Sequence, residues 1–347
     1  MKIGILTFHN IPNIGAILQS YSLCQALRQL GFECEIIDYN CENIIRRELT
    51  YHHHPNIFKD IAIRCFVWPK TVRKIKRCRD FMLSKEMYSV RQYNRQTIAD
   101  ANNHYDILMS GSDMIWDFAV TENDTTYLLD FSADNKYRYS YGSSCGDSVW
   151  NKEQLSVVRQ LLNRYNRIAV REESMRDILC DLGINAQLVA DPTMLLTPDQ
   201  WGKMAVNPKQ DNYVVVYFPS EKNLRAASLY AKKNNLQVIV INWGLPYRGF
   251  INCAPNDPME WVGYLKNAKA VFTNSYHGLL FALYFNKPVW IGKKGNRFSS
   301  ILDYLGIKGV ELDEDIDFQY TIDYNRVDAL LDKMRESSLK YLKGIGR

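Results

Sequence analysis

Residues 270–292 read AVFTNSYHGLLFALYFNKPVWIG, and the order of elements in this stretch decides the fold. The apolar residues 270–273 predict a strand, 278–285 a helix, and 288–291 a second strand. The polar segment that ends at His277 falls where the first strand gives way to the helix. In an open parallel sheet this is the carboxyl edge, where ligands bind, and a helix start there favours an anion. A histidine that is hydrogen-bonded within the core would satisfy the same pattern.

The rest of the chain repeats this alternation of strands and helices. KIGILTF predicts a first strand, residues 15–30 a helix with apolar residues on one face, and CEIIDY a second strand. The further predicted strands are YDILMSGSD, YRYSYGSS, RIAVRE, AQLVADP, YVVVYF and LQVIVIN. Such alternation predicts an α/β protein with two doubly wound parallel sheets.

A linker between two domains is predicted at residues 197–211, where periodicity is lost and prolines collect. We expect an N-terminal domain over residues 1–200, with a basic helical insertion at 43–100. A C-terminal domain is expected over 211–320. The final segment, 321–347, is expected to form a helix that packs back on the N-terminal domain.

Composition narrows the class of protein. Of 347 residues, 46% are hydrophobic and 23% charged, as in ordinary globular proteins. The eight cysteines form no C-x-x-C pair, which favours reduced thiols over a zinc site or disulfide framework. The first apolar run is too short for a signal peptide, and no later run reaches the length of a membrane span. We therefore expect a cytoplasmic enzyme.

Positive charge is concentrated in the predicted insertion. Residues 43–100 hold 13 Lys and Arg against 5 Asp and Glu, a net charge of +8. Its peak, RCFVWPKTVRKIKRCR at residues 64–79, has seven basic residues and no acid. Basic residues beside Phe66 and Trp68 are typical of contact with the inner membrane surface, but a solvated helix face beside a packed Phe-Val-Trp is the favoured explanation. No nucleic-acid motif accompanies this charge, and the run His52–His54 is expected on the surface without a metal.

Polar residues recur where predicted strands end. Asp113 closes SGSD, and Arg171 closes AVR, either to pair with an acid such as Glu172 or to bind phosphate or carboxylate. Asn13 and Gly15 open the first helix, where an ordinary cap is the alternative. Lys293 and Lys294 follow the last strand of the quoted stretch, where they could reach an anion or form a solvated turn.

Two other enzyme classes were weighed against these residues. No G-x-G-x-x-G follows the first strand, and no Walker A sequence is present. GSSCG at residues 142–146 fits the G-x-S-x-G pattern of hydrolases, with Asp191 and His277 following in hydrolase order. A nucleophile elbow needs a helix that starts at the serine, yet the next predicted helix is capped only at Asn151. A strand end built of small residues explains GSSCG without a nucleophile.

Taken together, the motifs resemble the polysaccharide pyruvyl transferase family. They are, in chain order, HNIPNIGAILQSYSL, GSDMIW, YSYGSSCG, AVREESM, ADPTMLL and TNSYHGLLFALYFNKP. The resemblance runs from residue 2 to about residue 310, while 43–100 matches no motif. It implies a GT-B-like pair of Rossmann-type domains that face each other across a cleft. It also implies transfer of pyruvate from phosphoenolpyruvate to a sugar, as a ketal, in capsule, exopolysaccharide or cell-wall assembly.

The resemblance implies that Arg171, His277 and Asp113 serve this reaction. Ketal formation needs a proton at the methylene carbon of phosphoenolpyruvate and a base near the acceptor. His277 is the expected acid or phosphate partner and Asp113 the expected base, with the reverse assignment open. The expected donor-binding residues are Arg171, Asn274, Ser275, His277, Gly278, Lys293 and Lys294. The expected acceptor-binding residues are Asn13, Gly15, Gln19, Asp113 and Ser143.

No cofactor or metal is expected besides phosphoenolpyruvate as co-substrate. The expected partner is a saccharide acceptor, lipid-linked, with 64–79 as the contact to the inner membrane face. Two alternatives stay open: a GT-B glycosyltransferase that uses a nucleotide sugar, and a non-catalytic saccharide-binding relative.

Overall fold

The computed structural model describes residues 1–346 except 256, 293–294, 313–317 and 319, and the side chains of 296–297. The chain divides into two compact units. The first unit comprises 1–50, 79–196 and 332–347, and the second comprises 51–78 and 197–331.

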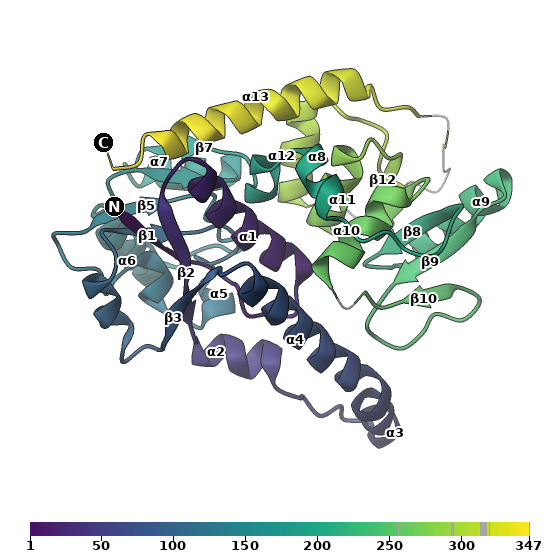
Figure 1. Cartoon of the computed structure of the whole chain (residues 1–347), viewed down its shortest axis with the longest axis horizontal. Coiled ribbons are helices and arrows are strands. Elements are labelled where there is room, and N and C mark those ends of the chain that lie inside the picture. The colour runs from purple at the N-terminus through teal and green to yellow at the C-terminus, as the bar shows by residue number, and fades with distance from the viewer. Residues whose placement is uncertain (256, 293–294, 313–317, 319, 347) are drawn as a thin grey trace. The chain divides into compact units, whose positions relative to one another are not determined.

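The first unit is built on a parallel five-stranded sheet with the strand order β3-β2-β1-β4-β5 (Figure 1). Its strands are β1 (Lys2–Leu6), β2 (Glu33–Tyr39), β3 (Tyr88–Tyr93), β4 (Ile107–Ser110) and β5 (Tyr137–Ser140). A parallel pair, β6 (Ile168–Val170) and β7 (Ala186–Leu188), continues from β5 through the bridge between Tyr139 and Arg167. The central strand β1 is buried from Ile3 to Leu6 because helices cover both faces of a doubly wound sheet.

Helices of the first unit follow the predicted alternation. They are α1 (Ile14–Gln29), α2 (Glu42–Ile44), α5 (Phe118–Thr121), α6 (Lys152–Leu162) and α7 (Glu173–Asp181). Short 3₁₀ turns occupy Ile98–Asn103, Thr125–Leu128 and Pro192–Leu195. Asn151 and Gln154 form the predicted capping box at the start of α6.

The last helix, α13 (Tyr324–Lys343), contributes its C-terminal part to the first unit. The Ser338 hydroxyl accepts a hydrogen bond from the Ala190 N–H at 2.8 Å, and the Tyr341 hydroxyl donates to the Ser140 carbonyl at 2.8 Å. Through these bonds α13 satisfies backbone groups at the ends of β5 and β7, which would otherwise lie buried without partners.

The second unit repeats the same topology. Its parallel sheet has the order β10-β9-β8-β11-β12, with β8 (Tyr213–Tyr217), β9 (Gln237–Ile241), β10 (Ile251–Cys253), β11 (Val271–Thr273) and β12 (Val289–Ile291). Its helices are α8 (Pro198–Met204), α9 (Glu221–Asn234), α10 (Pro258–Asn267), α11 (Tyr276–Tyr284) and α12 (Asn296–Leu305). Both sheets confirm the predicted Rossmann-type α/β architecture.

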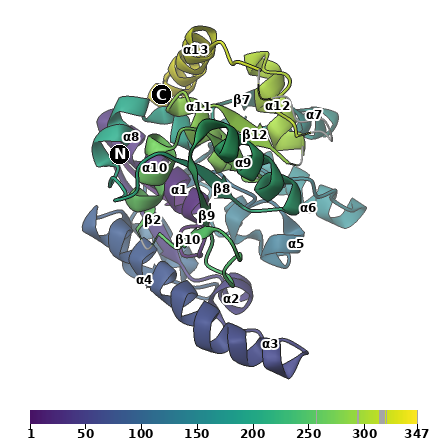
Figure 2. The same ribbon diagram turned by 90° about the vertical axis from the view of Figure 1, so that its right-hand side faces the viewer.

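Residues 57–84 form one helical run: α3 (Ile57–Ala62), a π-helical turn (Ile63–Val67) and α4 (Trp68–Ser84) (Figure 2). The whole of 43–100 was expected in the first domain, whereas residues 51–78 belong to the second unit. One reason is Lys74, whose ammonium lies 3.6 Å from the centre of the Trp243 ring. Among the helices that the structure describes, none has the length and apolar character needed to cross a bilayer.

Candidate functional site

The carboxyl edge of the first sheet gathers the polar residues that the sequence placed at strand ends. β1 ends before Thr7, whose hydroxyl donates to the Ser112 carbonyl at 2.8 Å. Gly111 follows β4, and a side chain there would meet Thr7 at 2.8 Å, so the two strand ends approach closely. Parallel strands bring these residues together because their carboxyl ends lie on one edge.

Asp113 lies three residues after β4 and is held in an unusual backbone conformation. Its φ of 79° is in the left-handed region, which side chains other than glycine rarely adopt. The Asp113 carbonyl accepts a hydrogen bond from the Ser144 N–H at 3.1 Å, and its carboxylate accepts one from the Met114 N–H at 2.9 Å. Such strained residues cluster at active sites, and Asp113 is 6% exposed at a ligand-binding edge.

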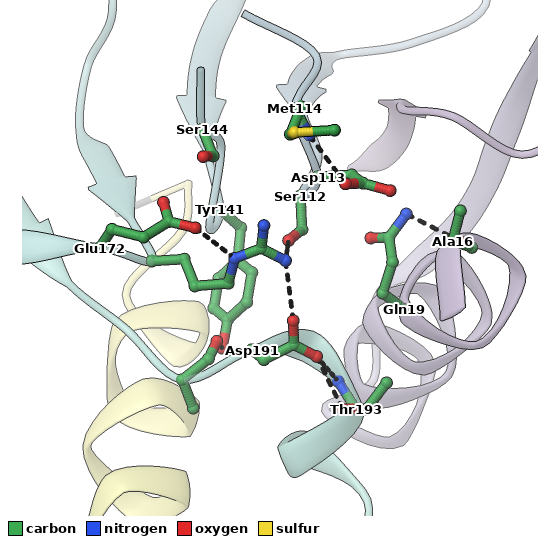
Figure 3. Close-up of polar contacts among 12 residues, drawn as sticks. Ala16, Gln19, Ser112, Asp113, Met114, Tyr141, Ser144, Glu172, Asp191 and Thr193 are labelled. Atoms are coloured by element: carbon green, nitrogen blue, oxygen red, sulfur yellow. Dashed lines mark hydrogen bonds and ion pairs between the residues drawn. The ribbon is translucent and has the colours of Figure 1, made fainter. Parts of the chain in front are cut away.

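Arg171, which follows β6, is ion-paired within the protein. Its Nε donates to Glu172 Oε1 at 2.8 Å, and its Nη1 donates to Asp191 Oδ2 at 2.9 Å (Figure 3). All three side chains are almost fully buried. The sequence left open whether Arg171 pairs with an acid or reaches a ligand, and in this structure it pairs with two acids.

Glu172 and Asp191 are site residues that the sequence analysis did not select. Asp191 also accepts hydrogen bonds from the Thr193 N–H and hydroxyl, at 2.9 and 2.6 Å. Glu172 Oε2, by contrast, is buried and has no hydrogen-bond partner among the described residues. Two carboxylates around one guanidinium leave a net negative charge at this edge. The signal was present in the motifs AVREE and ADP, where an acid stands at the end of each of two neighbouring strands.

The expected acceptor-binding residues differ in how many of their polar atoms already form hydrogen bonds within the protein. Ser143 is fully buried and its hydroxyl donates to the Gly111 carbonyl at 2.7 Å. Asn13 is exposed and caps α1 by accepting from the Gly15 N–H at 3.0 Å. Gln19 is buried, and its Nε2 donates to Thr7 Oγ1 at 3.1 Å and to the Ala16 carbonyl at 2.9 Å. Gln19 Oε1 has no partner among the residues described (Figure 3 shows the side chain).

A second polar cluster at the ends of β1 and β2 was not predicted. His9 Nε2 lies 3.2 Å from Asp38 Oδ1, and Arg79 Nη2 donates to Asp38 Oδ2 at 2.7 Å. Burial opposes the charged form of Asp38, but the hydrogen bonds from His9 and Arg79 outweigh it and lower its pKa well below the ordinary value. Beside this cluster lies a small pocket lined by Phe8, His9, Asn10, Ile11, Tyr39, Asn40, Cys41, Ile44, Ile45 and Tyr127.

The GSSCG segment does not form a nucleophile elbow. The helix that follows it, α6, begins only at Lys152, and Ser144 Oγ accepts from the Gly146 N–H at 2.9 Å. Burial, together with the nearby charge of Glu172, raises the pKa of the Cys145 thiol to about 12. Neither side chain is therefore prepared to act as a nucleophile.

The carboxyl edge of the second sheet is built around the NSYHG segment. Asn274 Nδ2 donates to the Phe218 carbonyl at 3.0 Å, and its Oδ1 accepts from the Gly292 N–H at 3.1 Å. This amide thereby joins the ends of β8 and β12 to the end of β11. Ser275 caps α11 by accepting from the Gly278 N–H at 3.3 Å.

His277 is the second residue of α11 and is 8% exposed, with its ring edge-on to Tyr276 at 5.6 Å between centroids. Gly278 lets the helix approach β11, because a Cβ there would lie 2.5 Å from Thr273 Oγ1. The structure thus brings Asn274, Ser275, His277 and Gly278 to one helix start. Lys293 and Lys294 lie outside the described residues.

The three expected catalytic residues fall in both units: Asp113 and Arg171 in the first, and His277 in the second. Among the described residues, no group of three or more His, Cys, Asp and Glu side chains is arranged to hold a metal ion. All eight cysteines are free thiols.

Comparison with solved structures places this architecture among known folds. A putative UDP-N-acetylglucosamine 2-epimerase from Listeria monocytogenes matches with a TM-score of 0.52 at 11% identity, over 98% of this chain and 90% of that one. The UDP-GlcNAc 2-epimerase from Neisseria meningitidis matches with a TM-score of 0.52 at 9% identity, over 99% and 94%. At such identities the likeness establishes the GT-B fold alone.

Sequence comparison identifies the family. No curated protein sequence matches the chain. The family model described as polysaccharide pyruvyl transferase matches residues 13–291, which include every motif from the first helix to the NSYHG segment. The chain therefore belongs to the polysaccharide pyruvyl transferase family.

Proposed function

We propose that this protein transfers pyruvate from phosphoenolpyruvate to two hydroxyls of one saccharide, forming a cyclic ketal and releasing phosphate. The family match over residues 13–291 carries this proposal. In the balanced reaction, one proton adds to the methylene carbon and creates the methyl group. Two hydroxyl oxygens bond to the neighbouring carbon, whose bond to the phosphate oxygen breaks. Of the two hydroxyl protons, one balances the proton on carbon and the other leaves with phosphate.

The donor phosphate is proposed to bind at the start of α11. Ser275 and Asn274 fix this helix start, where the helix dipole and N–H groups favour an anion. His277, in the first turn, is proposed to protonate the methylene carbon or to bind the phosphate. Lys293 and Lys294, after β12, are proposed to add positive charge for the three negative charges of the donor.

The base is proposed to be one of two buried carboxylates in the first unit. Asp113 was the expectation from sequence, and its strained backbone supports it. Glu172 offers a carboxylate oxygen with no partner among the described residues, which a saccharide hydroxyl would satisfy. Arg171 is proposed to hold Glu172 and Asp191 in place rather than to bind phosphate directly, because its Nε and Nη1 already donate to them.

The acceptor is proposed to be a lipid-linked saccharide of capsule, exopolysaccharide or cell-wall assembly, at the cytoplasmic membrane face. Gln19 Oε1 and the exposed Asn13 side chain are the proposed acceptor contacts. Ser143 and Gly15 are proposed to support the acceptor site without side-chain contacts to the sugar. The Ser143 hydroxyl already donates to the Gly111 carbonyl, and glycine has no side chain.

The test incubates the purified protein with phosphoenolpyruvate and a panel of nitrophenyl glycosides. We expect phosphate release together with a glycoside mass gain equal to pyruvate less one water, and loss of both in His277→Gln. Ligand binding without either product would favour the non-catalytic saccharide-binding relative. Thermal stabilisation by UDP-sugars, and not by phosphoenolpyruvate, would favour the glycosyltransferase.

A further inference from the structure

We propose that residues 57–66 insert into the surface of an anionic lipid bilayer, with the basic residues of α4 contacting the headgroups. The proposal goes beyond the reaction and depends on the proposed function only for its purpose, delivery of the enzyme to a lipid-linked acceptor. It extends the contact from the basic segment 64–79 that the sequence suggested to the apolar residues of α3 before it.

The first observation is a cluster of large apolar side chains in solvent. Ile57, Phe58 and Ile61 share one face of α3 and are 68%, 80% and 55% exposed. Phe66 in the following π-helical turn is 65% exposed. Single exposed apolar residues are common on soluble proteins, but four within ten residues of one helical run mark a contact surface.

The second observation is the charge around this cluster. Residues 51–78 contain seven Lys and Arg and one acid, so 7 − 1 gives +6. Lys59, Arg64, Arg73 and Arg77 are exposed, while Lys74 is turned away from solvent onto Trp243. A helical segment with exposed apolar side chains and basic neighbours fits an anionic membrane surface, where each part adds to binding.

The single acid of this segment, Asp60, accepts hydrogen bonds from other residues of the same segment. Asp60 accepts from the Tyr51 hydroxyl at 2.7 Å and from the His54 N–H at 2.7 Å, and these hydrogen bonds lower its pKa to about 2. Asp60 therefore stays charged, but its side chain is only 16% exposed and the seven basic residues of the segment outnumber it.

The exposed apolar side chains lie on an ordered, capped helix. Asn56 caps α3 by accepting from the N–H groups of Phe58 and Lys59, both at 3.1 Å. The Tyr51 ring packs edge-on against Trp68 at 5.5 Å, which ties the segment before α3 to the start of α4. A preordered apolar surface loses little conformational entropy on insertion, and the basic residues around it favour an anionic bilayer as its occupant.

Vesicle co-sedimentation of the full chain tests the proposal, with pure phosphatidylcholine vesicles compared with vesicles that contain phosphatidylglycerol. We expect binding to the anionic vesicles only. The double variant Phe58→Ser/Ile61→Ser should bind at least tenfold more weakly, and Arg73→Glu/Arg77→Glu should bind more weakly and lose the salt dependence. The control Leu229→Ser/Leu245→Ser removes two other exposed apolar side chains of the same unit, 48% and 47% exposed, and should bind normally.

Two results would overturn the proposal: no binding of the unchanged protein to anionic vesicles, or equal binding by Phe58→Ser/Ile61→Ser. If that variant instead abolished a concentration-dependent dimer, the surface would contact a second copy and the membrane proposal would be wrong. Phosphate release with a soluble nitrophenyl glycoside, measured without vesicles, should be the same in this variant. The two assays therefore test the reaction and the membrane contact independently.

Discussion

Arg171 and Asp191 are joined by an ion pair of 2.9 Å, although they lie 20 residues apart and follow two neighbouring strands. Neither side chain is accessible to solvent to any useful extent. With Glu172 on its other side, the guanidinium holds two carboxylates at the edge where ligands bind. Pairing with Glu172 was one of the two roles that the sequence allowed for Arg171, whereas Asp191 was not expected as a second partner.

Removal of the guanidinium should therefore destabilise the fold. Arg171→Ala leaves two buried carboxylates without their cation, which we expect to lower the free energy of unfolding by about 3–5 kcal/mol. Urea unfolding measures this change. Arg176→Ala, which breaks an exposed pair on α7, is the control and should change stability by less than about 1 kcal/mol. If Arg171→Ala keeps its stability and only raises KM for phosphoenolpyruvate, the arginine is a donor ligand instead.

Glu172→Gln should separate chemistry from stability. The amide keeps an oxygen that can accept from Arg171 Nε, so the fold should survive, but it cannot take a proton from a hydroxyl. We expect kcat for pyruvyl transfer to fall about 10²–10⁴-fold, the range that general bases supply. Glu173→Gln, at the exposed next residue, should retain normal turnover. Full activity in Glu172→Gln would leave Asp113 as the base.

The cluster around Asp38 should make stability depend on acidity. The folded-state pKa of Asp38 lies below its unfolded value of about 3.9, so the group stabilises the fold above that pH and the effect is lost as pH falls. Asp38→Asn should therefore lower the melting temperature at pH 7. The difference from the unchanged protein should shrink as the pH approaches 3, which a series of thermal melts would show. A constant difference from pH 7 to 3 would contradict the role of its charge.

Lys74 should also make stability rise with pH, but at alkaline pH and because its buried charge destabilises the fold. Burial on Trp243 lowers the pKa of Lys74 to about 8, so unfolding takes up a proton between pH 8 and 10.4 and stability rises with pH in that range. Lys74→Met keeps the chain length and removes the buried charge. We expect the free energy of unfolding at pH 7 to rise by about 1–2 kcal/mol, because removal of the buried charge outweighs loss of the contact with the indole. The melting temperature should rise accordingly, and the gain should be smaller at pH 10. Lys76→Met, two positions along the helix and exposed to solvent, should show no such pH-dependent gain.

Two helical glycines in the second unit offer a test of close packing. Gly278→Ala would place a Cβ 2.5 Å from Thr273 Oγ1, the atom that also accepts from the Ser275 N–H, so we expect a loss of about 1–3 kcal/mol. Gly202→Ala meets nothing closer than 3.7 Å and should stabilise α8 by up to about 1 kcal/mol. Equal effects in chemical denaturation would show that helix propensity, and not the approach of α11 to β11, decides both.

The sequence predicted the elements well because their signals are local. The apolar periodicity around residues 15–30 and the strand–helix–strand order at 270–291 correspond to α1 and to β11-α11-β12. The positions of Asp113 and Asn274 at strand ends followed from the same rule, since parallel strands share a carboxyl edge.

What the sequence could not supply were pairings between distant segments. The bonds from Arg171 to Asp191 and from Asp38 to Arg79 join residues 20 and 41 positions apart, and no periodicity encodes them. The contact of Lys74 with Trp243, which joins 51–78 to the rest of the second unit, likewise links residues far apart in the chain. The Ser143 hydroxyl donates to the Gly111 carbonyl, and this pairing depends on the register between neighbouring strands, which the sequence does not show.

The left-handed backbone at Asp113 has a consequence for how its role is tested. Alanine lacks the short polar side chain that lets aspartate and asparagine adopt this conformation, so an impaired Asp113→Ala protein would not distinguish a missing carboxylate from a misfolded turn. Asparagine tolerates the same geometry and differs only in its charge. A homologue with asparagine at this position should fold normally but lack the carboxylate. Such a protein would be a natural inactive variant, and this one residue would identify it.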